Sequence, residues 1–167
     1  MSRTEILLAE FDHEMANTRR TLERIPDDQL SYQPHAKSGS MGWLVSHLAN
    51  IPVWTVRALE QESFDFSPPG SQPRRTVVLN STKEVLERFD KNTDDARKAI
   101  SAAREEAFSE PWSLLAGGQT VFTMPRGGVI RNMVLNHSIH HRGQLTVYMR
   151  LNDIPVPGLY GASADEK

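Results

Sequence analysis

The sequence predicts an all-α protein in which four helices form a bundle. Apolar residues return every three or four positions in four separate segments, as they do on one face of a helix. The four segments cover about residues 3–25, 40–61, 82–107 and 126–152. The 167 residues suffice for one domain, 1–167, with a buried core, and they contain no internal repeat or low-complexity segment.

The first and third predicted helices begin at recognisable caps. Ser2 with Glu5, and Ser81 with Glu84, have the spacing of a capping box, in which two side chains satisfy backbone N–H groups of the first turn. Pro26 ends the first helix, because proline has no N–H group with which to continue it. The third helix shows no pattern that suggests chemistry.

The second predicted helix contains a proline in its interior. Serine and glycine at 38–40 supply cap candidates at its start. Pro52 removes the hydrogen bond to the carbonyl of Leu48 and should kink the helix near His47. Such a kink is either a packing feature or the opening of a cleft beside that histidine.

The connections are long for a four-helix chain. They cover about residues 26–39, 62–80 and 108–125. The middle one is rich in proline and glycine, and its length permits a crossover between the second and third helices. In the third, a β-branched and aromatic run after Gly117-Gly118 predicts a short hairpin. The tail from Asn152 to Lys167 has too much proline and glycine for a fifth helix.

Composition and charge exclude several classes of function. The 19 lysine and arginine residues nearly balance 21 aspartate and glutamate residues, and a formal charge of −2 argues against a nucleic-acid partner. A small-molecule substrate fits this charge better. The absence of cysteine excludes disulfides, thiolate metal sites and cysteine nucleophiles. No run reaches the roughly 18 apolar residues of a membrane span, and the charged N-terminus does not resemble a signal peptide, so we expect a cytoplasmic protein.

Three of the six histidines stand within five residues, in the run NHSIHHRGQ of the fourth predicted helix. His137 and His141 replace apolar residues in a core-facing row, and residues four apart meet on one helix face, so the pair can hold one ion. The natural third ligand is His47, the only other histidine on a core-facing stripe. Three neutral imidazoles are typical of a catalytic site that water or substrate completes. Nitrogen ligands suit zinc, nickel, iron or cobalt.

His140 lies beside the pair and could replace either partner, since it is three positions from His137. We interpret it as a flanking or interface residue, because the row through His137 and His141 is the more continuous apolar stripe. Metal-bound imidazoles usually donate their second N–H group to a partner. The candidates for that role within helical reach are Asn50, Asn136 and Gln144.

Several of these residues also have a purely structural interpretation. A buried histidine is more often a hydrogen-bonded core residue than a ligand, and HxxxH pairs are common. Tryptophans could line a cleft beside the ion, yet aromatic residues at helical spacing belong to the core more often. The tryptophans are Trp43, Trp54 and Trp112. Arg142 either binds an anionic group or is a solvated charge on the helix surface.

The stretch LVSHLAN, followed much later by NHSIHHRGQLTVYMRLNDIPVPGLYGASADE, resembles the DinB/YfiT-like superfamily. The run HHRGQL with VPGLYGASADE is more specific than an HxxxH pair. The resemblance implies a four-helix bundle in up-down-down-up order, with a long crossover between helices 2 and 3. It further implies a divalent ion, commonly nickel or zinc, on one histidine of helix 2 and an i, i+4 pair of the last helix. These positions match His47, His137 and His141.

The activities of this superfamily are less uniform than its metal site. Some members are transferases or isomerases that use mycothiol or bacillithiol, and others are described as metal-dependent hydrolases without a known substrate. The resemblance therefore implies a metal-dependent enzyme with a small-molecule substrate, for which a low-molecular-weight thiol is one candidate. Homodimers are frequent among relatives. The alternative is a metal-binding or stress-response protein without turnover.

The chemistry of such an enzyme would depend mainly on the ion. A bound divalent ion lowers the pKa of a water or substrate group toward neutrality. No acidic residue is clearly spaced to act as a general base. The candidates, if the fold brings them close, are Asp12, Glu14, Asp165 and Glu166.

Overall fold

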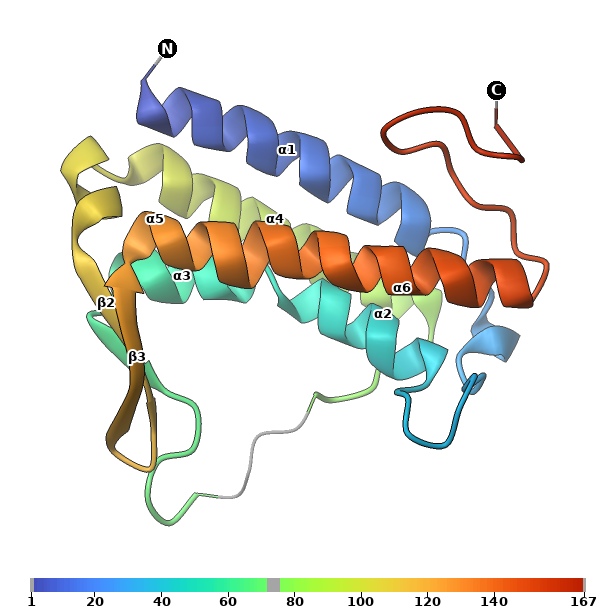
Figure 1. The fold of residues 1–167 in the computed structure, drawn as a ribbon, viewed down its shortest axis with the longest axis horizontal. Coiled ribbons are helices and arrows are strands. Elements are labelled where there is room, and N and C mark those ends of the chain that lie inside the picture. Colours follow the sequence, from blue (N-terminus) through green and yellow to red (C-terminus); the bar gives the residue numbers. More distant parts are fainter. Residues whose placement is uncertain (1, 72–75, 167) are drawn as a thin grey trace.

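Helices form most of the structure, a computed structural model that describes residues 2–71 and 76–166 (Figure 1). All four predicted helices are present, and two of them are interrupted. The helices are α1 (Arg3–Leu22), α2 (Met41–Asn50), α3 (Val53–Glu60), α4 (Thr82–Ala102), α5 (Arg126–Val129) and α6 (His137–Leu151). α2 with α3 forms the second rod, and α5 with α6 forms the fourth. Within the described part of the chain, no helix combines the length and apolar character needed to cross a membrane.

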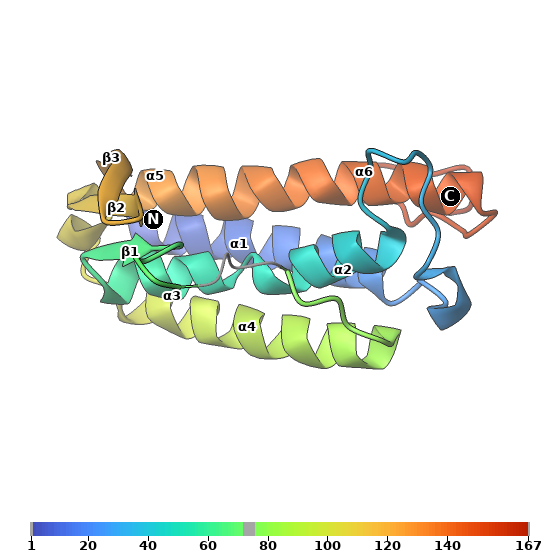
Figure 2. The same ribbon diagram turned by 90° about the horizontal axis from the view of Figure 1, so that it is seen from below.

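The four rods pack side by side around one core. α4 contacts α1, α2 and α3, and α6 contacts α1 and α2. Figure 2 shows α1 and the second rod between α4 on one side and the fourth rod on the other. In Figure 1, α1 and α6 run in one direction, and α2, α3 and α4 run in the opposite one. Fully buried apolar side chains come from every rod: Phe11, Met15, Leu22, Met41, Leu48, Ile51, Phe89, Ile100, Ile130 and Leu135.

The predicted caps determine where two helices begin. The Ser2 hydroxyl accepts a hydrogen bond from the Glu5 N–H at 3.1 Å, and the Glu5 carboxylate accepts one from the Ser2 N–H at 2.7 Å. The first capping box is therefore complete. Ser81 caps α4 by accepting from the Glu84 N–H at 3.2 Å, but the Glu84 carboxylate accepts from the N–H of Asn80. The second box is thus only half formed.

The predicted kink at Pro52 is confirmed, and it separates α2 from α3. Because proline has no N–H group to donate, the carbonyl of Leu48 accepts the N–H of Ile51 instead, at a long 3.4 Å. The bend lies shortly after His47 in the chain. α3 then continues toward the end of the bundle where a small sheet packs (Figure 1).

The fourth rod differs from the predicted continuous helix. It starts as α5, runs through a π-helical segment, Ile130–Asn136, and becomes α6 at His137. A π-helical turn holds more residues than an α-helical turn, so it changes the direction in which the following side chains point. The segment has only seven residues and stands inside a row of apolar residues with α-helical spacing, so the sequence pattern does not reveal it.

A small three-stranded sheet corrects the all-α prediction. Its strands are β1 (Ser63–Asp65), β2 (Pro111–Ala116) and β3 (Gln119–Pro125), in the order β1-β2-β3. β2 and β3 form the predicted hairpin, which turns at Gly117 and Gly118 with φ of 61° and 78°, values that glycine adopts without strain. β1 pairs in parallel with β2. A three-residue strand inside a proline-rich connection gives no periodic signal, so the sequence does not predict it.

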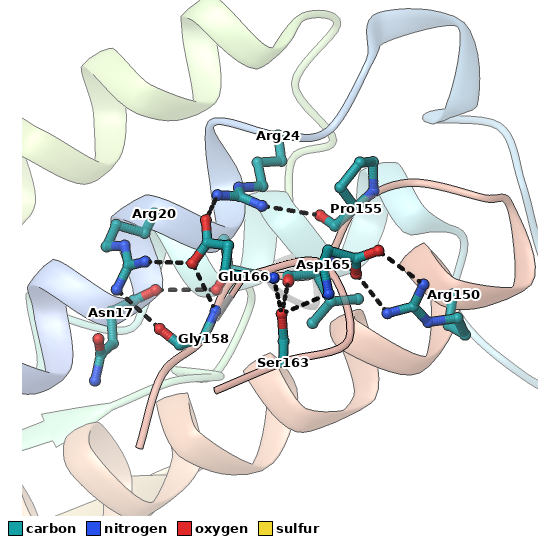
Figure 3. Close-up of polar contacts among 11 residues, drawn as sticks. Asn17, Arg20, Arg24, Arg150, Pro155, Gly158, Ser163, Asp165 and Glu166 are labelled. Atoms are coloured by element: carbon teal, nitrogen blue, oxygen red, sulfur yellow. Dashed lines mark hydrogen bonds and ion pairs between the residues drawn. The ribbon is translucent and has the colours of Figure 1, made fainter. Parts of the chain in front are cut away.

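The tail after α6 folds back to α1 and, as predicted, contains no helix within residues 152–166. Figure 3 shows that arginines of both helices hold its acidic residues. The ion pairs are Glu166 with Arg20 and Arg24, and Asp165 with Arg150. The tail therefore links α1 to α6 through charged contacts at the protein surface.

Candidate metal centre

Three histidine side chains from two helices converge at one place. His47 comes from α2, and His137 and His141 come from adjacent turns of α6, which packs against α2. The Nε2 atom of His137 lies 3.3 Å from that of His47 and 2.8 Å from that of His141. One ring nitrogen of each residue lies within 4.8 Å of the other two. The structure thus brings together the three residues that the sequence selects, although 90 positions separate His47 from His137.

This spacing suits a metal ion. Two nitrogen ligands at about 2.0–2.1 Å from an ion, at an angle of about 90–110°, are about 2.8–3.4 Å apart. The Nε2 separations of 2.8 and 3.3 Å lie within this range. The three rings are half-buried, so solvent or a ligand can still reach them. The group could therefore hold a divalent ion and leave coordination positions for another molecule.

Two of the rings have a polar partner besides the other histidines. The side-chain oxygen of Gln144 lies 2.7 Å from Nδ1 of His141, which makes Nδ1–H the donor and leaves the lone pair on Nε2. His137 forms a hydrogen bond with the backbone of Met133, one turn earlier in the π-helical segment. The contact with Gln144 therefore directs Nε2 of His141 toward Nε2 of His137.

The ring of His47 is held by an aromatic contact. The indole of Trp43 stacks on the imidazole, with ring centroids 4.9 Å apart and an interplanar angle of 9°. The same indole meets the ring of His141 edge to face, at a centroid distance of 6.0 Å. The Thr76 hydroxyl lies 3.5 Å from Nδ1 of His47, at the limit of a hydrogen bond. Trp43 therefore orients the rings of His47 and His141.

Burial keeps the three imidazoles neutral. Desolvation, followed by repulsion from His141 and His137, lowers the pKa of His47 to about 4. Desolvation is also the largest cause that lowers the pKa of His137 and the pKa of His141. Neutral imidazole is the form that binds a metal, so these ligands need not lose protons at neutral pH before an ion enters.

The other polar residues near the pair have different roles. His140 is exposed, and its ring lies beside that of His141 with centroids 5.0 Å apart, outside the group of three converging nitrogens. Asn50 and Asn136 form hydrogen bonds within their own helical segments. The predicted partner role is therefore wrong for these two asparagines and right for Gln144.

The candidate acids are engaged away from the histidines. Glu14 is buried between α1 and α6, where its carboxylate pairs with Arg142 at 2.6 Å and accepts from the Tyr160 hydroxyl at 2.7 Å. Arg142 is 1% exposed, so its interpretation as a solvated charge is wrong, and the anionic group that it binds is the carboxylate of Glu14. Asp12 pairs with Arg97, and the two tail acids pair with arginines of α1 and α6. Among the described residues, none of these acids joins the histidine group.

A cavity of about 630 Å³ opens beside His47, between α2, α3 and the sheet. Its apolar lining consists of Ile51, Val53, Trp54, Phe64, Phe66, Val77, Leu114 and Met133. Its polar lining consists of His47, Asn50, Arg57, Thr76 and Arg88. No acidic side chain occurs among the described residues that line it. Of the tryptophans proposed for a cleft, Trp54 lines the cavity and Trp112 is fully buried against it.

The sequence does not mark Arg57 and Arg88 as residues of this site. Arginines on amphipathic helices are expected on the solvent face, and nothing in the pattern distinguishes these two from the others. The one available signal is weak: Arg57 lies three positions after Trp54, on the same helix face, just beyond the Pro52 kink.

The fold and the site define a class of protein, a mostly helical bundle with a three-histidine group that could hold a metal ion. The DinB family model matches residues 1–166, and the chain belongs to the DinB family. It is 44% identical over 160 residues to the uncharacterised protein YrdA of Bacillus subtilis (strain 168). That alignment covers 95% of this chain and 89% of the relative.

Solved structures share the fold. A DinB-like protein from Bacillus cereus ATCC 10987 gives a TM-score of 0.72 at 24% identity, over 93% of this chain and 97% of the other. The DinB-like protein YjoA from Bacillus subtilis gives a TM-score of 0.67 at 18% identity, over 90% of this chain and 95% of the other. Similarity at this level shows the fold and leaves the reaction to be argued from the site.

Proposed function

We propose that this protein is a metal-dependent enzyme, built on a bundle in up-down-down-up order, in which His47, His137 and His141 hold a divalent ion. Nickel or zinc is the proposed ion, and iron or cobalt also suits nitrogen ligands. The observation that supports the proposal best is the convergence of three Nε2 atoms beside a cavity of about 630 Å³. A site that only stabilises the fold needs no such space for a substrate.

The proposed reaction is hydrolysis or the transfer of a low-molecular-weight thiol. A bound divalent ion supplies a Lewis acid that lowers the pKa of a water or thiol toward neutrality. Gln144, the backbone of Met133 and the indole of Trp43 keep the three rings in place. The apolar walls of the cavity exclude water from a bound substrate. Because no acidic side chain lines the described cavity, we assign no carboxylate as general base.

Elemental analysis of protein purified without a polyhistidine tag tests the ion. We expect about one nickel or zinc per chain, or uptake of about one ion after either metal is added to metal-free protein. A stoichiometry near zero that added zinc and nickel leave unchanged would overturn the proposal.

A turnover assay on zinc-loaded and nickel-loaded protein tests the reaction. One panel combines low-molecular-weight thiols with electrophiles, and the second contains esters and amides. Product that forms only with the metal-loaded protein, and not with a His141→Ala variant, supports an enzyme and identifies its class. If the protein binds its ion but forms no product in either panel, the alternative of a non-catalytic metal-binding or stress-response protein replaces the enzyme.

We also propose that the protein acts as a cytoplasmic homodimer, as its resemblance to the superfamily implies. Val147 and Leu151 of α6 support an interface, because they are 58% and 60% exposed although both are apolar. Light scattering on the purified protein tests the mass. A monomer at every concentration would exclude the dimer.

A further inference from the structure

We propose that the cavity beside the histidines binds a small amphipathic carboxylate, whose anionic group contacts Arg57 and Arg88 and whose apolar body contacts the aromatic wall. The cavity and both arginines are observed independently of any ion. The identification of this carboxylate as the substrate rests on the proposed function. The binding itself does not, because it can be measured in the metal-free protein.

The charges that face the cavity have one sign. Arg57 belongs to α3 and Arg88 to α4, so two packed helices each contribute a guanidinium. No acidic side chain occurs among the described residues of the lining. An anion in the cavity is attracted to both guanidiniums, and a cation is repelled by them. The lining therefore favours an anion and disfavours a cation.

Arg88 is positioned near the histidines without an ion pair. Its guanidinium donates to the side-chain oxygen of Asn50 at 3.4 Å, and Asn50 lies three positions after His47 in α2. Within residues 2–71 and 76–166, no carboxylate is paired with Arg88. A guanidinium has five N–H donors, and one long hydrogen bond leaves most of them for a ligand.

Arg57 is oriented by the aromatic residues of the same cavity. Its guanidinium carbon lies 4.0 Å from the ring centroid of Phe64 and 4.9 Å from that of Trp54. Stacking of this kind fixes the plane of the group. The backbone carbonyl of Arg57 accepts the indole N–H of Trp112 at 3.1 Å, which holds the end of α3 in place. A planar guanidinium whose orientation is fixed suits the two oxygens of a carboxylate.

The apolar wall defines the rest of the ligand. The side chains of Trp54, Phe64, Phe66 and Leu114 provide aromatic and aliphatic surface next to the two arginines. The cavity volume of about 630 Å³ lies within the range of about 300–1,000 Å³ for small-molecule sites. A ligand with one aromatic or branched group and one carboxylate complements both parts of the lining.

Isothermal titration calorimetry on the full chain tests the inference with two probes of one shape, 3-phenylpropanoate and its neutral counterpart 3-phenylpropanamide. Each is titrated into metal-free and zinc-loaded protein. We expect the metal-free protein to bind the carboxylate about tenfold more tightly than the amide, as a charge-assisted contact to arginine predicts. Arg88→Gln should remove most of this preference and leave the affinity for the amide unchanged.

Arg97→Gln is the matched control, because Arg97 is also an exposed arginine of α4 but pairs with Asp12 and does not line the cavity. It should keep the preference for the carboxylate. Arg57→Lys is the second test variant, with a thermal unfolding curve to establish that it is folded. It retains a positive charge but loses the planar fork, so the preference should fall less than in Arg88→Gln.

The outcomes separate this inference from the proposed function. Equal affinities for the two probes in the metal-free protein would overturn the inference, as would a preference that Arg88→Gln leaves intact. A preference that appears only with zinc would also overturn it, because the carboxylate would then bind at the histidines, and the proposed enzyme would stand. If zinc does not bind but the arginine-dependent preference is present, the carboxylate site is supported and the proposed function fails.

Discussion

His141 and Arg142 are neighbours on α6, but they point to different sides of the helix and meet different surroundings. His141 is half-buried near the cavity, and its Nε2 faces another imidazole nitrogen at 2.8 Å. Arg142 is 1% exposed and points toward α1. There the guanidinium donates to the carboxylate of Glu14 and to the hydroxyls of Thr18 and Tyr160.

The comparison shows that the completeness of hydrogen bonding distinguishes a structural polar group from a candidate site more clearly than burial does. The Glu14–Arg142 pair is more deeply buried than the histidines, yet its partners are all within the protein. The histidines are less buried, and their Nε2 atoms face one another instead of a set of donors. Nitrogen atoms arranged in this way are suited to an external ligand.

The largest expected effect is on stability, from Arg142→Met. The substitution leaves the buried carboxylate of Glu14 without its cation, so we expect the free energy of unfolding to fall by about 3–5 kcal/mol. Urea denaturation measures this change. The double variant Glu14→Gln/Arg142→Met removes both charges and should recover part of the loss. If the free energy of unfolding of the single variant falls by less than about 1 kcal/mol, the Glu14–Arg142 pair behaves as a surface salt bridge. The pair would then not differ from the histidines as a structural polar group.

The second prediction concerns the histidine side of the same helix. His137→Ala and His141→Ala each remove one ligand, and we expect each to lower the zinc affinity more than about 100-fold. The reason is that loss of a hydrogen-bond partner of a ligand already lowers metal affinity about 10–100-fold, and loss of the ligand itself costs more. Competition with a chelator measures the affinity. His140→Ala is the control and should retain it, because His140 lies outside the converging group. An equal loss in all three variants would show that the pair is wrongly assigned.

A smaller effect is expected from Gln144→Ala. The side-chain oxygen of Gln144 fixes the ring of His141 through Nδ1, and loss of such a partner typically lowers metal affinity about 10–100-fold. Asn136→Ala is a matched control, since Asn136 is bonded within its own segment. The free energy of unfolding of the metal-free protein should change little in either variant. Unchanged zinc affinity in Gln144→Ala would mean that packing alone orients the ring.

Much of the fold follows from local patterns. Apolar periodicity predicts the four helices, Ser2 with Glu5 predicts the first cap, and Gly117-Gly118 predicts the hairpin. β1 escapes prediction because its pairing with β2 depends on a contact between residues far apart in the chain, and three residues show no alternation. The π-helical segment escapes because the same apolar spacing suits an α-helix.

The candidate site is only partly predictable for a similar reason. The i, i+4 spacing identifies His137 and His141, and His47 follows because it is the remaining histidine on a core-facing stripe. The environment of Arg142 does not follow, since its partner Glu14 is 128 positions away and the sequence does not show which helix faces it. Charged residues are expected at the surface, and a buried pair is recognised only when both partners are seen together.

The smallest expected effect concerns a second glutamate–arginine contact, that of Glu166 with Arg24, which lies at the surface (Figure 3). The backbone N–H of Gly158 and the guanidinium of Arg24 hold the pKa of the Glu166 carboxyl below its ordinary value of 4.5. Because the pKa is lower in the folded state, the contact stabilises the tail above pH 4.5 and is lost as the pH falls through the folded value.

Hydrogen exchange measures the attachment of the tail. The reporter is the protection of the Gly158 amide, because this N–H group donates to Glu166. Protection should fall on acidification in the wild type, and Glu166→Gln should weaken it near neutral pH and remove most of its pH dependence. The free energy of global unfolding should change much less than in Arg142→Met, because water and salt screen a half-buried ion pair at the surface much more than a fully buried one. Equal losses in the two variants would show that the tail contributes to the core of the bundle, and that exposure does not separate the two glutamate–arginine contacts.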